Sequence, residues 1–529
     1  MTGLRIDNLA IRLPKGGDRT HALSGITLAV APGEILCVVG ESGSGKSVTA
    51  SAVMGLLAPG LMVEQGSVTL NGQDLLALTP EQWRTTRGER IAMVFQEPMT
   101  ALNPLMTVGR QLAEMWIVHR GLSRRDALAR AEAALTEVQL PDPAGALNAF
   151  PHELSGGQRQ RVMIAMALAL EPELLICDEP TTALDVTTQA QVLTLIRDLQ
   201  RRHNTAVMFI THDFGVVAEI ADRVAVMQLG RLVEEGPAAQ VLKAPQHPYT
   251  QALLAAVPPL NAPAARLAGS GEPVLELDGL TKTYASRGIF RRRKPVRALD
   301  GISATLRRGT TLGIVGESGS GKSTLARCVV GLMGLDGGAI RIAGRPLPPD
   351  RQKAAHLAQM VFQDPYASLN PRRSVGAQVA QGPIAAGTPR DAAWAEARRL
   401  FSLVGLDPDS VRRYPHEFSG GQRQRIGIAR ALAMKPEVLV ADEPVSALDV
   451  SVQAQVLALL RELQAQLGLS ILFITHDLRV AAQLCDEVVV MQNGRVAEAG
   501  PVAEVFTNPR HAYTQSLLAA VPGRAVLEG

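Results

Sequence analysis

The octapeptide GESGSGKS occurs twice in this chain, at residues 40–47 and again at 316–323. Both copies have the form G-x-x-x-x-G-K-[ST], and each follows a short apolar run and precedes a helical pattern. In such a loop backbone N–H groups surround phosphate oxygens, the lysine reaches the β- and γ-phosphates, and the serine hydroxyl can bind Mg²⁺. The alternative for one isolated copy is a glycine-rich turn with a solvated lysine, but two identical copies in the same context favour two nucleotide sites. The predicted phosphate-binding residues are Gly40, Glu41, Ser42, Gly43, Ser44, Gly45, Lys46 and Ser47, with Gly316, Glu317, Ser318, Gly319, Ser320, Gly321, Lys322 and Ser323.

The octapeptide belongs to a longer internal repeat. The chain is a tandem duplication, because the following pairs occur in the same order in both halves: VFQEPMTALNP (94–104) and VFQDPYASLNP (361–371), PHELSGGQRQR (151–161) and PHEFSGGQRQR (415–425), FITHD (209–213 and 473–477), and HPYTQALLAAVP (247–258) and HAYTQSLLAAVP (511–522).

The segment between the two halves is typical of a linker. Residues 258–273, PPLNAPAARLAGSGEP, are rich in proline, alanine and glycine and show no apolar periodicity. We therefore predict a first domain over residues 1–262, a linker over 263–273 and a second domain over 274–529.

Composition limits the class of protein. The chain has 529 residues and a net charge of +3, so it is too long for one core and lacks the basic charge of a nucleic-acid binder. It shows neither a secretory signal nor an apolar run of membrane-spanning length, and we expect it in the cytoplasm. Its four cysteines do not stand at metal-ligand spacing, and buried free thiols explain them better than disulfides.

Each half alternates short apolar runs with helical patterns. Runs such as EILCVVG and ELLICDE, with TLGIVG and EVLVADE in the second half, predict strands that are buried on both faces of a largely parallel sheet. Between the VFQ segment and the SGGQ segment the pattern becomes helical. We therefore expect an α/β nucleotide-binding core with a helical insertion in each half.

Acidic residues and a histidine follow predicted strands in both halves. In the pairs Asp178-Glu179 and Asp442-Glu443 the aspartate suits the Mg²⁺ shell, and the glutamate can polarise the water that attacks the γ-phosphate. Such carboxylates alone are often solvated loop starts, and a histidine at a strand end is often structural. The duplicated nucleotide loop favours catalytic roles for Glu179, Glu443, His212 and His476.

The SGGQ segment predicts a second kind of phosphate contact. It stands immediately before a helix in each half, so its hydroxyl and free N–H groups form a positive helix end. A half that already has a phosphate loop does not need this contact for its own nucleotide. We therefore expect each SGGQ segment to complete the site of a partner half.

Together these motifs resemble those of ABC-transporter ATPases over nearly the whole chain. The resemblance implies two P-loop ABC nucleotide-binding domains, each α/β with a RecA-like core, an antiparallel β part, a helical subdomain and a C-terminal extension. It also implies a head-to-tail sandwich that holds two ATP molecules and Mg²⁺. One site would combine Lys46, Ser47, Gln96, Asp178, Glu179 and His212 with Ser419, Gly420, Gly421 and Gln422. The other would combine Lys322, Ser323, Gln363, Asp442, Glu443 and His476 with Ser155, Gly156, Gly157 and Gln158. The Mg²⁺ ligands would be Ser47, Gln96, Asp178, Ser323, Gln363 and Asp442.

The resemblance also implies an aromatic residue that stacks on each adenine. Tyr284 fits this role in the second half, but Leu13 stands at the matching position of the first. We therefore expect a weaker grip on the nucleotide of the first half.

The two HPYTQ-type extensions resemble those of oligopeptide, dipeptide and nickel importer ATPases. The halves resemble a D-type and an F-type subunit in that order, similar to the fused ATPases of glutathione and microcin C importers. Many D-type subunits carry a cysteine cluster in this extension; none of the four cysteines lies in either extension here, so no iron–sulfur cluster is predicted.

The basic run RRRK (291–294) is interpreted as a solvated loop, with anionic lipid as the alternative partner.

The resemblance predicts the energy-coupling subunit of a bacterial importer for small peptides. Its partners would be two permease subunits, docking at residues 97–104 and 364–371, and indirectly a substrate-binding protein. It would lie at the cytoplasmic face of the inner membrane. One alternative is a soluble tandem ATPase acting on ribosomes or DNA, which the short linker and the lack of CxxC pairs disfavour. A non-hydrolysing regulatory module is the other, and Glu179 and Glu443 disfavour it.

Overall fold

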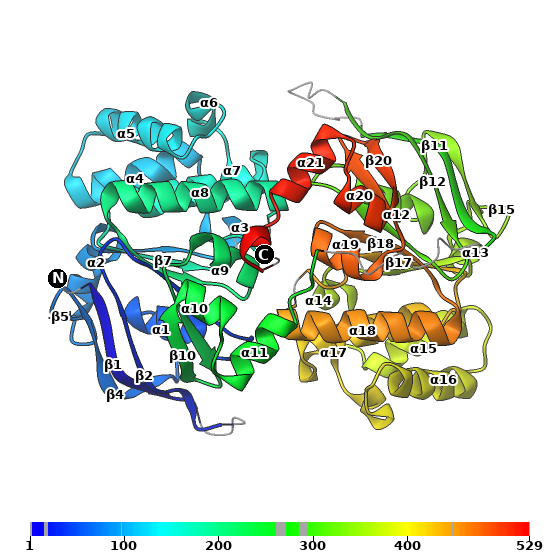
Figure 1. Cartoon of the computed structure of the whole chain (residues 1–529), viewed down its shortest axis with the longest axis horizontal. Coiled ribbons are helices and arrows are strands. Elements are labelled where there is room, and N and C mark those ends of the chain that lie inside the picture. Colours follow the sequence, from blue (N-terminus) through cyan, green and yellow to red (C-terminus); the bar gives the residue numbers. More distant parts are fainter. Residues whose placement is uncertain are drawn as a thin grey trace. The chain divides into compact units, whose positions relative to one another are not determined.

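The computed structural model describes residues 3–14, 19–96, 98–182, 184–260, 271–284, 295–446 and 448–527. The chain divides into two compact units, one of Met1–Val257 with Pro522–Gly529 and the other of Pro258–Val521 (Figure 1). Most of the predicted linker and the basic run 291–294 lie outside the described residues, and the proposed division at 263–273 stays a prediction.

The first unit contains two sheets. A six-stranded sheet has the order β10-β9-β3-β8-β7-β6, in which only the pairing of β10 with β9 is antiparallel. An antiparallel sheet has the order β2-β1-β4-β5. The strands are β1 (Leu4–Arg12), β2 (His21–Val30), β3 (Ile35–Val39), β4 (Met62–Leu70), β5 (Gln73–Asp74), β6 (Ile91–Val94), β7 (Leu174–Asp178), β8 (Ala206–Ile210), β9 (Arg223–Gln228) and β10 (Arg231–Pro237).

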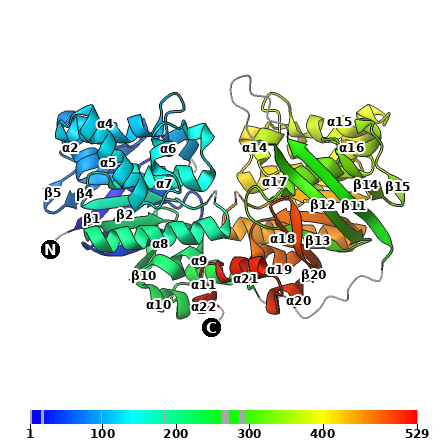
Figure 2. The same ribbon diagram turned by 90° about the horizontal axis from the view of Figure 1, so that it is seen from above.

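Helices follow most of these strands, and α4 to α6 group together at one side of the unit (Figure 2). The α-helices are α1 (Lys46–Val53), α2 (Pro80–Glu89), α3 (Pro98–Ala101), α4 (Val108–Arg120), α5 (Arg124–Glu137), α6 (Pro143–Leu147), α7 (Gly156–Leu168), α8 (Val186–His203), α9 (Phe214–Ile220), α10 (Ala238–Lys243), α11 (Pro248–Ala255) and, from the chain's end, α22 (Arg524–Leu527). A 3₁₀ turn, η1 (Pro151–Glu153), precedes α7.

The second unit repeats this architecture. Its sheets have the orders β12-β11-β14-β15 and β16-β17-β18-β13-β19-β20. The strands are β11 (Pro273–Tyr284), β12 (Val296–Arg307), β13 (Thr311–Val315), β14 (Gly337–Ile342), β15 (Arg345–Pro346), β16 (Ala358–Val361), β17 (Val438–Asp442), β18 (Ser470–Thr475), β19 (Glu487–Gln492) and β20 (Arg495–Pro501). The helices are α12 (Lys322–Val329), α13 (Arg351–Ala355), α14 (Pro365–Ser368), α15 (Val375–Ala385), α16 (Arg390–Leu403), η2 (Pro408–Arg412), η3 (Pro415–Glu417), α17 (Gly420–Leu432), α18 (Val450–Leu467), α19 (Leu478–Leu484), α20 (Val502–Thr507) and α21 (Ala512–Ala519).

The parallel strands are apolar on both faces because two separate cores enclose them. On β3, Leu36 and Val38 pack in the core shared with the antiparallel sheet, whereas Cys37 and Val39 pack in the core shared with the helices. All four side chains are buried. Alternate residues of a strand point to opposite faces, which is why these strands are continuously apolar rather than alternating.

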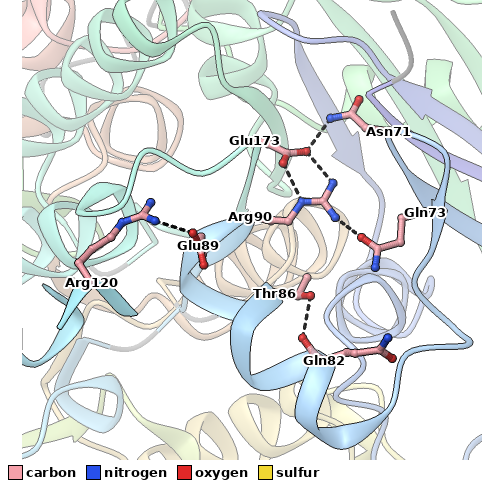
Figure 3. Close-up of polar contacts among 8 residues, drawn as sticks. All are labelled: Asn71, Gln73, Gln82, Thr86, Glu89, Arg90, Arg120 and Glu173. Carbon is pink, nitrogen blue, oxygen red and sulfur yellow. Dashed lines mark hydrogen bonds and ion pairs between the residues drawn. The ribbon is translucent and has the colours of Figure 1, made fainter. Parts of the chain in front are cut away.

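A polar network ties three elements of the first unit together around Arg90 (Figure 3). Arg90 donates from Nε to Glu173 Oε1 at 2.7 Å, from Nη2 to Glu173 Oε2 at 3.0 Å, and from Nη1 to Gln73. Asn71 also donates to Glu173. The Arg90 hydrogen bond is the main cause that lowers the pKa of Glu173. The network therefore links the β4–β5 turn, the start of β6 and the residue before β7.

Among the helices of the described ranges, none combines the length and the apolar character needed to cross a membrane.

Candidate functional site

The two GESGSGKS loops adopt the same conformation between a buried strand and a helix. In the first unit Gly45 precedes α1 with φ +106, and a Cβ there would lie 2.6 Å from a Leu23 methyl group, so the position requires glycine. The Lys46 side chain is buried and donates from Nζ to the carbonyl oxygens of Gly40 at 2.6 Å and Glu41 at 3.0 Å. Lys322 makes the matching bonds in the second unit at 2.8 and 2.7 Å. Each lysine side chain is thus folded back onto the first two carbonyl oxygens of its own loop.

An oxygen-rich pair stands beside each loop. Ser47 Oγ donates to Asp178 Oδ1 at 3.3 Å, and Ser323 Oγ donates to Asp442 Oδ1 at 3.3 Å. Burial raises the pKa of both aspartates, and the neighbouring glutamate adds to that effect. Hydroxyl and carboxylate oxygens are the ligands that Mg²⁺ prefers, and a cation would offset the cost of a buried, ionised aspartate. The donor set therefore fits a divalent cation.

Glu179 is held by several groups in the first unit. It follows the end of β7 with φ +47, a backbone conformation that residues other than glycine rarely adopt. Its carboxylate accepts from Gln96 Nε2 at 3.0 Å and pairs with His212 Nδ1 at 3.1 Å. Burial alone would raise the pKa of Glu179, but the His212 bond and charge and the Lys46 charge together lower it. The carboxylate of Glu179 is therefore kept ionised and held in a fixed orientation.

The second unit reproduces this arrangement. Glu443 also has φ +47, accepts from Gln363 Nε2 at 2.8 Å and pairs with His476 Nδ1 at 3.2 Å. Burial opposes the shift, but His476 lowers the pKa of Glu443, and Glu443 in turn raises the pKa of His476 against its burial. The Lys46, Ser47, Gln96, Asp178, Glu179 and His212 set thus has a full counterpart in the second unit.

One polar contact differs between the two units. Thr182 Oγ1 donates to Glu179 Oε2 at 3.1 Å, whereas the hydroxyl of Ser446 donates to the backbone carbonyl oxygen of Glu443 at 3.1 Å. Among the described residues, Thr182 is therefore a hydroxyl donor to the carboxylate of Glu179 that the carboxylate of Glu443 does not share. Sequence analysis missed this contact because threonine and serine carry the same hydroxyl.

The SGGQ segments form capped helix ends. Ser155 Oγ accepts from Gln158 N at 3.2 Å and Gln158 Oε1 accepts from Ser155 N at 2.9 Å, a capping box that Ser419 and Gln422 repeat. The two glycines differ in their surroundings. A Cβ on Gly157 would lie 2.4 Å from Thr188, whereas a Cβ on Gly156 would meet no atom within 4 Å. Gly157 is therefore required for packing against α8, whereas no neighbouring atom requires glycine at position 156.

Tyr284, the predicted adenine contact, ends β11 beside α12. Its hydroxyl lies 3.2 Å from Thr324 Oγ1 and donates to Met333 Sδ at 3.2 Å, and the side chain is 41% exposed. Leu13 instead packs against the apolar core of the first unit. The first unit therefore lacks an exposed ring at this position.

Comparisons with known proteins identify the family. A family model described as "ABC transporter" matches residues 23–182 and 299–446, more than half of the chain and both nucleotide loops. The chain belongs to the ABC transporter family. Each half is accordingly an ABC ATPase domain, which confirms the predicted fold class. A second model, "Oligopeptide/dipeptide transporter, C-terminal region", matches residues 233–294 and 497–525.

Whole-length relatives of this ABC protein are also known. It is 47% identical to the peptidoglycan transport ATP-binding protein YejF of Agrobacterium fabrum, over 98% of this chain and 96% of that protein. It is 46% identical to the glutathione import ATP-binding protein GsiA of Pectobacterium atrosepticum, over 98% and 89% respectively. Among solved structures, cbiO1 of Clostridium perfringens, part of the ABC transporter complex cbiONQ, is 32% identical over 45% of this chain and 92% of that one, with a TM-score of 0.40. The predicted resemblance to fused peptide-importer ATPases is confirmed.

This ABC protein also contains two site residues that the sequence analysis did not single out. The tyrosines of the two C-terminal extensions, Tyr249 and Tyr513, contact the nucleotide loops directly. The sequence signal was the repeat of HPYTQ as HAYTQ, but a turn followed by an amphipathic helix predicts only packing on the core.

Proposed function

We propose that this ABC protein hydrolyses ATP at two sites to drive the import of glutathione or other small peptides through membrane permeases. The observation that carries the proposal is the complete set of loop lysine, aspartate, glutamate, glutamine and histidine in both units. The whole-length relatives support the importer role and the class of cargo. They give no support to a soluble ATPase that acts on ribosomes or DNA.

In the proposed mechanism the loop N–H groups and Lys46 or Lys322 bind the phosphates of ATP. Ser47 with Asp178, and Ser323 with Asp442, would hold Mg²⁺, and Gln96 and Gln363 would be further ligands. The cation would supply charge neutralisation on the phosphates. Glu179 and Glu443 accept the proton of the attacking water because their lowered pKa keeps them ionised. His212 and His476 orient these glutamates.

Each site would be completed by the other half. Ser155 and Ser419 stand at the starts of helices α7 and α17, where unpaired N–H groups and the helix dipole favour an anion. We propose that Ser419, Gly420, Gly421 and Gln422 complete the first site, and that Ser155, Gly156, Gly157 and Gln158 complete the second. ATP would then close the two halves, and closure would switch the permeases between inward- and outward-facing states.

The permeases would dock beside residues 97–104 and 364–371. Residue 97 lies outside the described residues. In the second unit Tyr366 is 65% exposed, with the Arg423 guanidinium 3.5 Å from its ring centre. A cavity of about 470 Å³ stands nearby, lined among others by Phe362, Gln381 and Arg430. Such a depression suits a short helix of a permease. The protein would thus sit peripherally at the cytoplasmic face of the inner membrane, and the binding protein would act only through the permeases.

The first experiment is ATP hydrolysis by this chain assembled with its permeases in lipid vesicles. The binding protein would be added empty, or loaded with glutathione, dipeptides or longer peptides. We expect one loaded form of the binding protein to stimulate ATP hydrolysis, and the compound that it carries identifies the cargo. Stimulation by ribosomes or DNA, together with failure to assemble with permeases, would contradict the proposal.

Glu179→Gln and Glu443→Gln test whether both sites are hydrolytic. Since both glutamates are held alike by glutamine and histidine, each single variant should lose the same share of turnover. The double variant should lose at least about 100-fold. Greatly different residual rates in the two single variants would show that the sites are unequal.

A further inference from the structure

The tyrosine of each C-terminal extension holds the opening turn of a nucleotide loop. The Tyr249 hydroxyl accepts from the backbone N–H of Glu41 at 3.1 Å and donates to Glu41 Oε2 at 3.3 Å. In the second unit the Tyr513 hydroxyl accepts from the N–H of Glu317 at 3.0 Å. Glu41 and Glu317 are the second residues of GESGSGKS. The same contact thus forms independently in both units, across about 200 residues of chain.

The extension itself is fixed by a second set of hydrogen bonds. Glu234 on β10 accepts from the N–H groups of Gln246 at 2.7 Å and His247 at 3.1 Å. His247 Nδ1 then accepts from Tyr249 N at 3.2 Å and so caps α11. Glu498 and His511 repeat this arrangement before Tyr513. The histidine of the motif therefore fixes the start of the helix, and the helix positions the tyrosine against the nucleotide loop.

The peptide units around Glu41 are held from two directions. Lys46, a residue of the loop, binds the carbonyl oxygens of Gly40 and Glu41, and Tyr249, a residue of the extension, binds the Glu41 N–H. In the proposed mechanism Lys46 must turn its charge to the phosphates, which weakens its hold on these carbonyl oxygens. The tyrosine belongs to the extension rather than to the loop, so its contact need not change when phosphate binds. It can therefore keep the opening turn in shape in both states.

We propose that Tyr249 and Tyr513 are positioning residues that preorganise the two nucleotide loops, and that the HPYTQ-type extension exists partly to supply them. The inference rests on the proposed ATP sites and adds to them a role for the extension. A loop already in its bound shape loses less conformational freedom on binding, so nucleotide affinity should depend on these two hydroxyl groups.

The test compares Tyr249→Phe, Tyr513→Phe and the double variant in the full-length chain. Phenylalanine keeps the ring and removes only the hydroxyl. The matched control is Gln251→Ala with Gln515→Ala. These exposed glutamines lie on the same two helices, and the side chain of each donates to a nearby carbonyl oxygen, that of Pro245 or Pro509, at 3.0 Å. The measurements are MgADP binding by calorimetry, the thermal midpoint without nucleotide, and KM and kcat for ATP in the permease complex.

The expected result is about a three- to tenfold weaker affinity for MgADP at each altered site, which is the usual range for the loss of a hydroxyl's hydrogen bonding. The KM for ATP should rise while kcat at saturating ATP is kept, because the loop's shape affects ground and transition states alike. The midpoint and the control variants should match wild type.

Three outcomes separate the inference from the proposed function. If wild type does not bind MgADP, the proposed ATP sites fail and the inference fails with them. If wild type binds and the phenylalanine variants stay within twofold of it, only the inference is overturned. A weaker affinity that appears only with a lowered nucleotide-free midpoint also overturns it, since the hydroxyl would then support the fold rather than the loop.

Discussion

The two signature glycines separate a structural requirement from a functional one. Gly157→Ala places a methyl group 2.4 Å from Thr188 and should destabilise the first unit by about 1–3 kcal/mol. Gly156→Ala meets no neighbouring atom, so its stability should stay within about 0.5 kcal/mol of wild type. If position 156 faces a phosphate of the partner site, Gly156→Ala should still lower ATP turnover at least about tenfold. Urea midpoints and turnover in the permease complex check both expectations; normal turnover in Gly156→Ala would contradict the proposed composite site.

The residues at the adenine end predict that the two sites bind nucleotide with unequal affinity, although both hydrolyse ATP. Tyr284 is exposed beside α12, whereas Leu13 is partly buried and packs against the core. Replacing the aliphatic side chain, Leu13→Tyr, should strengthen nucleotide binding in the first unit by about two- to tenfold, the usual worth of an aromatic stack. Tyr284→Leu should weaken the second site by a similar factor. Calorimetric titration with MgADP should resolve two affinities in wild type that converge in either variant; one shared affinity in wild type would contradict the expectation.

For single residues, the sequence predicted chemical roles better than it predicted side-chain contacts. The loops, the aspartate–glutamate pairs and the histidines are recognisable because each depends on a residue type at fixed spacing. Thr182 donates its hydroxyl to the carboxylate of Glu179, whereas Ser446 donates its hydroxyl to a backbone carbonyl oxygen. Both contacts depend on side-chain rotamers, which no local sequence pattern predicts. The roles assigned to the site residues stay predictions until variants test them.

Between elements, the Arg90 network of the first unit makes a pH prediction. The pKa of Glu173 is lowered in the folded chain, mainly by its hydrogen bond with Arg90, relative to the usual value of 4.5. A group with a lowered folded pKa contributes its stability above the unfolded pKa and loses it as the pH falls through the folded pKa. The advantage of wild type over Glu173→Gln should therefore be full at neutral pH and shrink below about pH 4.5.

The pair is partly exposed, so the difference at neutral pH should be only about 0.5–1 kcal/mol. Urea unfolding monitored by fluorescence in a Trp394→Phe background checks it, because Trp83 and Trp116 then report the first unit alone. Glu81→Gln, on α2 and outside the network, is the control. A difference between wild type and Glu173→Gln that does not change with pH would contradict the assigned cause.

Strands were predictable where burial dictates the apolar pattern of the sequence. Continuous apolar runs indicated the parallel strands because both of their faces are buried. The antiparallel sheet was expected only from the family resemblance, since strands such as β4 are largely exposed and carry little pattern. The contact of Tyr249 with Glu41 spans 208 residues, and no periodicity in either segment encodes it.

For the molecule as a whole, the end of the chain belongs to the first unit. Gly523 N donates to Glu219 Oε1 at 2.9 Å, and a Cβ on Gly215 would lie 2.7 Å from the carbonyl oxygen of Pro522. Both contacts cover α9, the helix that follows His212. The predicted second domain, 274–529, did not anticipate this, because the segment after HAYTQSLLAAVP has no pattern that specifies a partner.

In a chain truncated after Val521, the backbone hydrogen bonds of α9 should therefore open more often than in the full-length chain. Hydrogen exchange of residues 214–220 should accelerate in the truncated chain, while the matching residues 478–484 of α19 keep their wild-type rates. Glu219→Ala in the full-length chain should reproduce part of the effect, because it removes the acceptor for Gly523. Wild-type exchange rates for residues 214–220 in the truncated chain would show that the last residues do not support α9.

This arrangement also sets an order of events during synthesis. Domains usually fold as they emerge from the ribosome, the N-terminal one first. Here Gly523, whose N–H donates to the Glu219 carboxylate, is translated 304 positions after Glu219. The first domain can reach most of its structure early, but its α9 surface is finished only after residues 522 and 523 have been made. Ribosome-stalled chains that lack this last segment would carry an unfinished first domain beside a nearly complete second one.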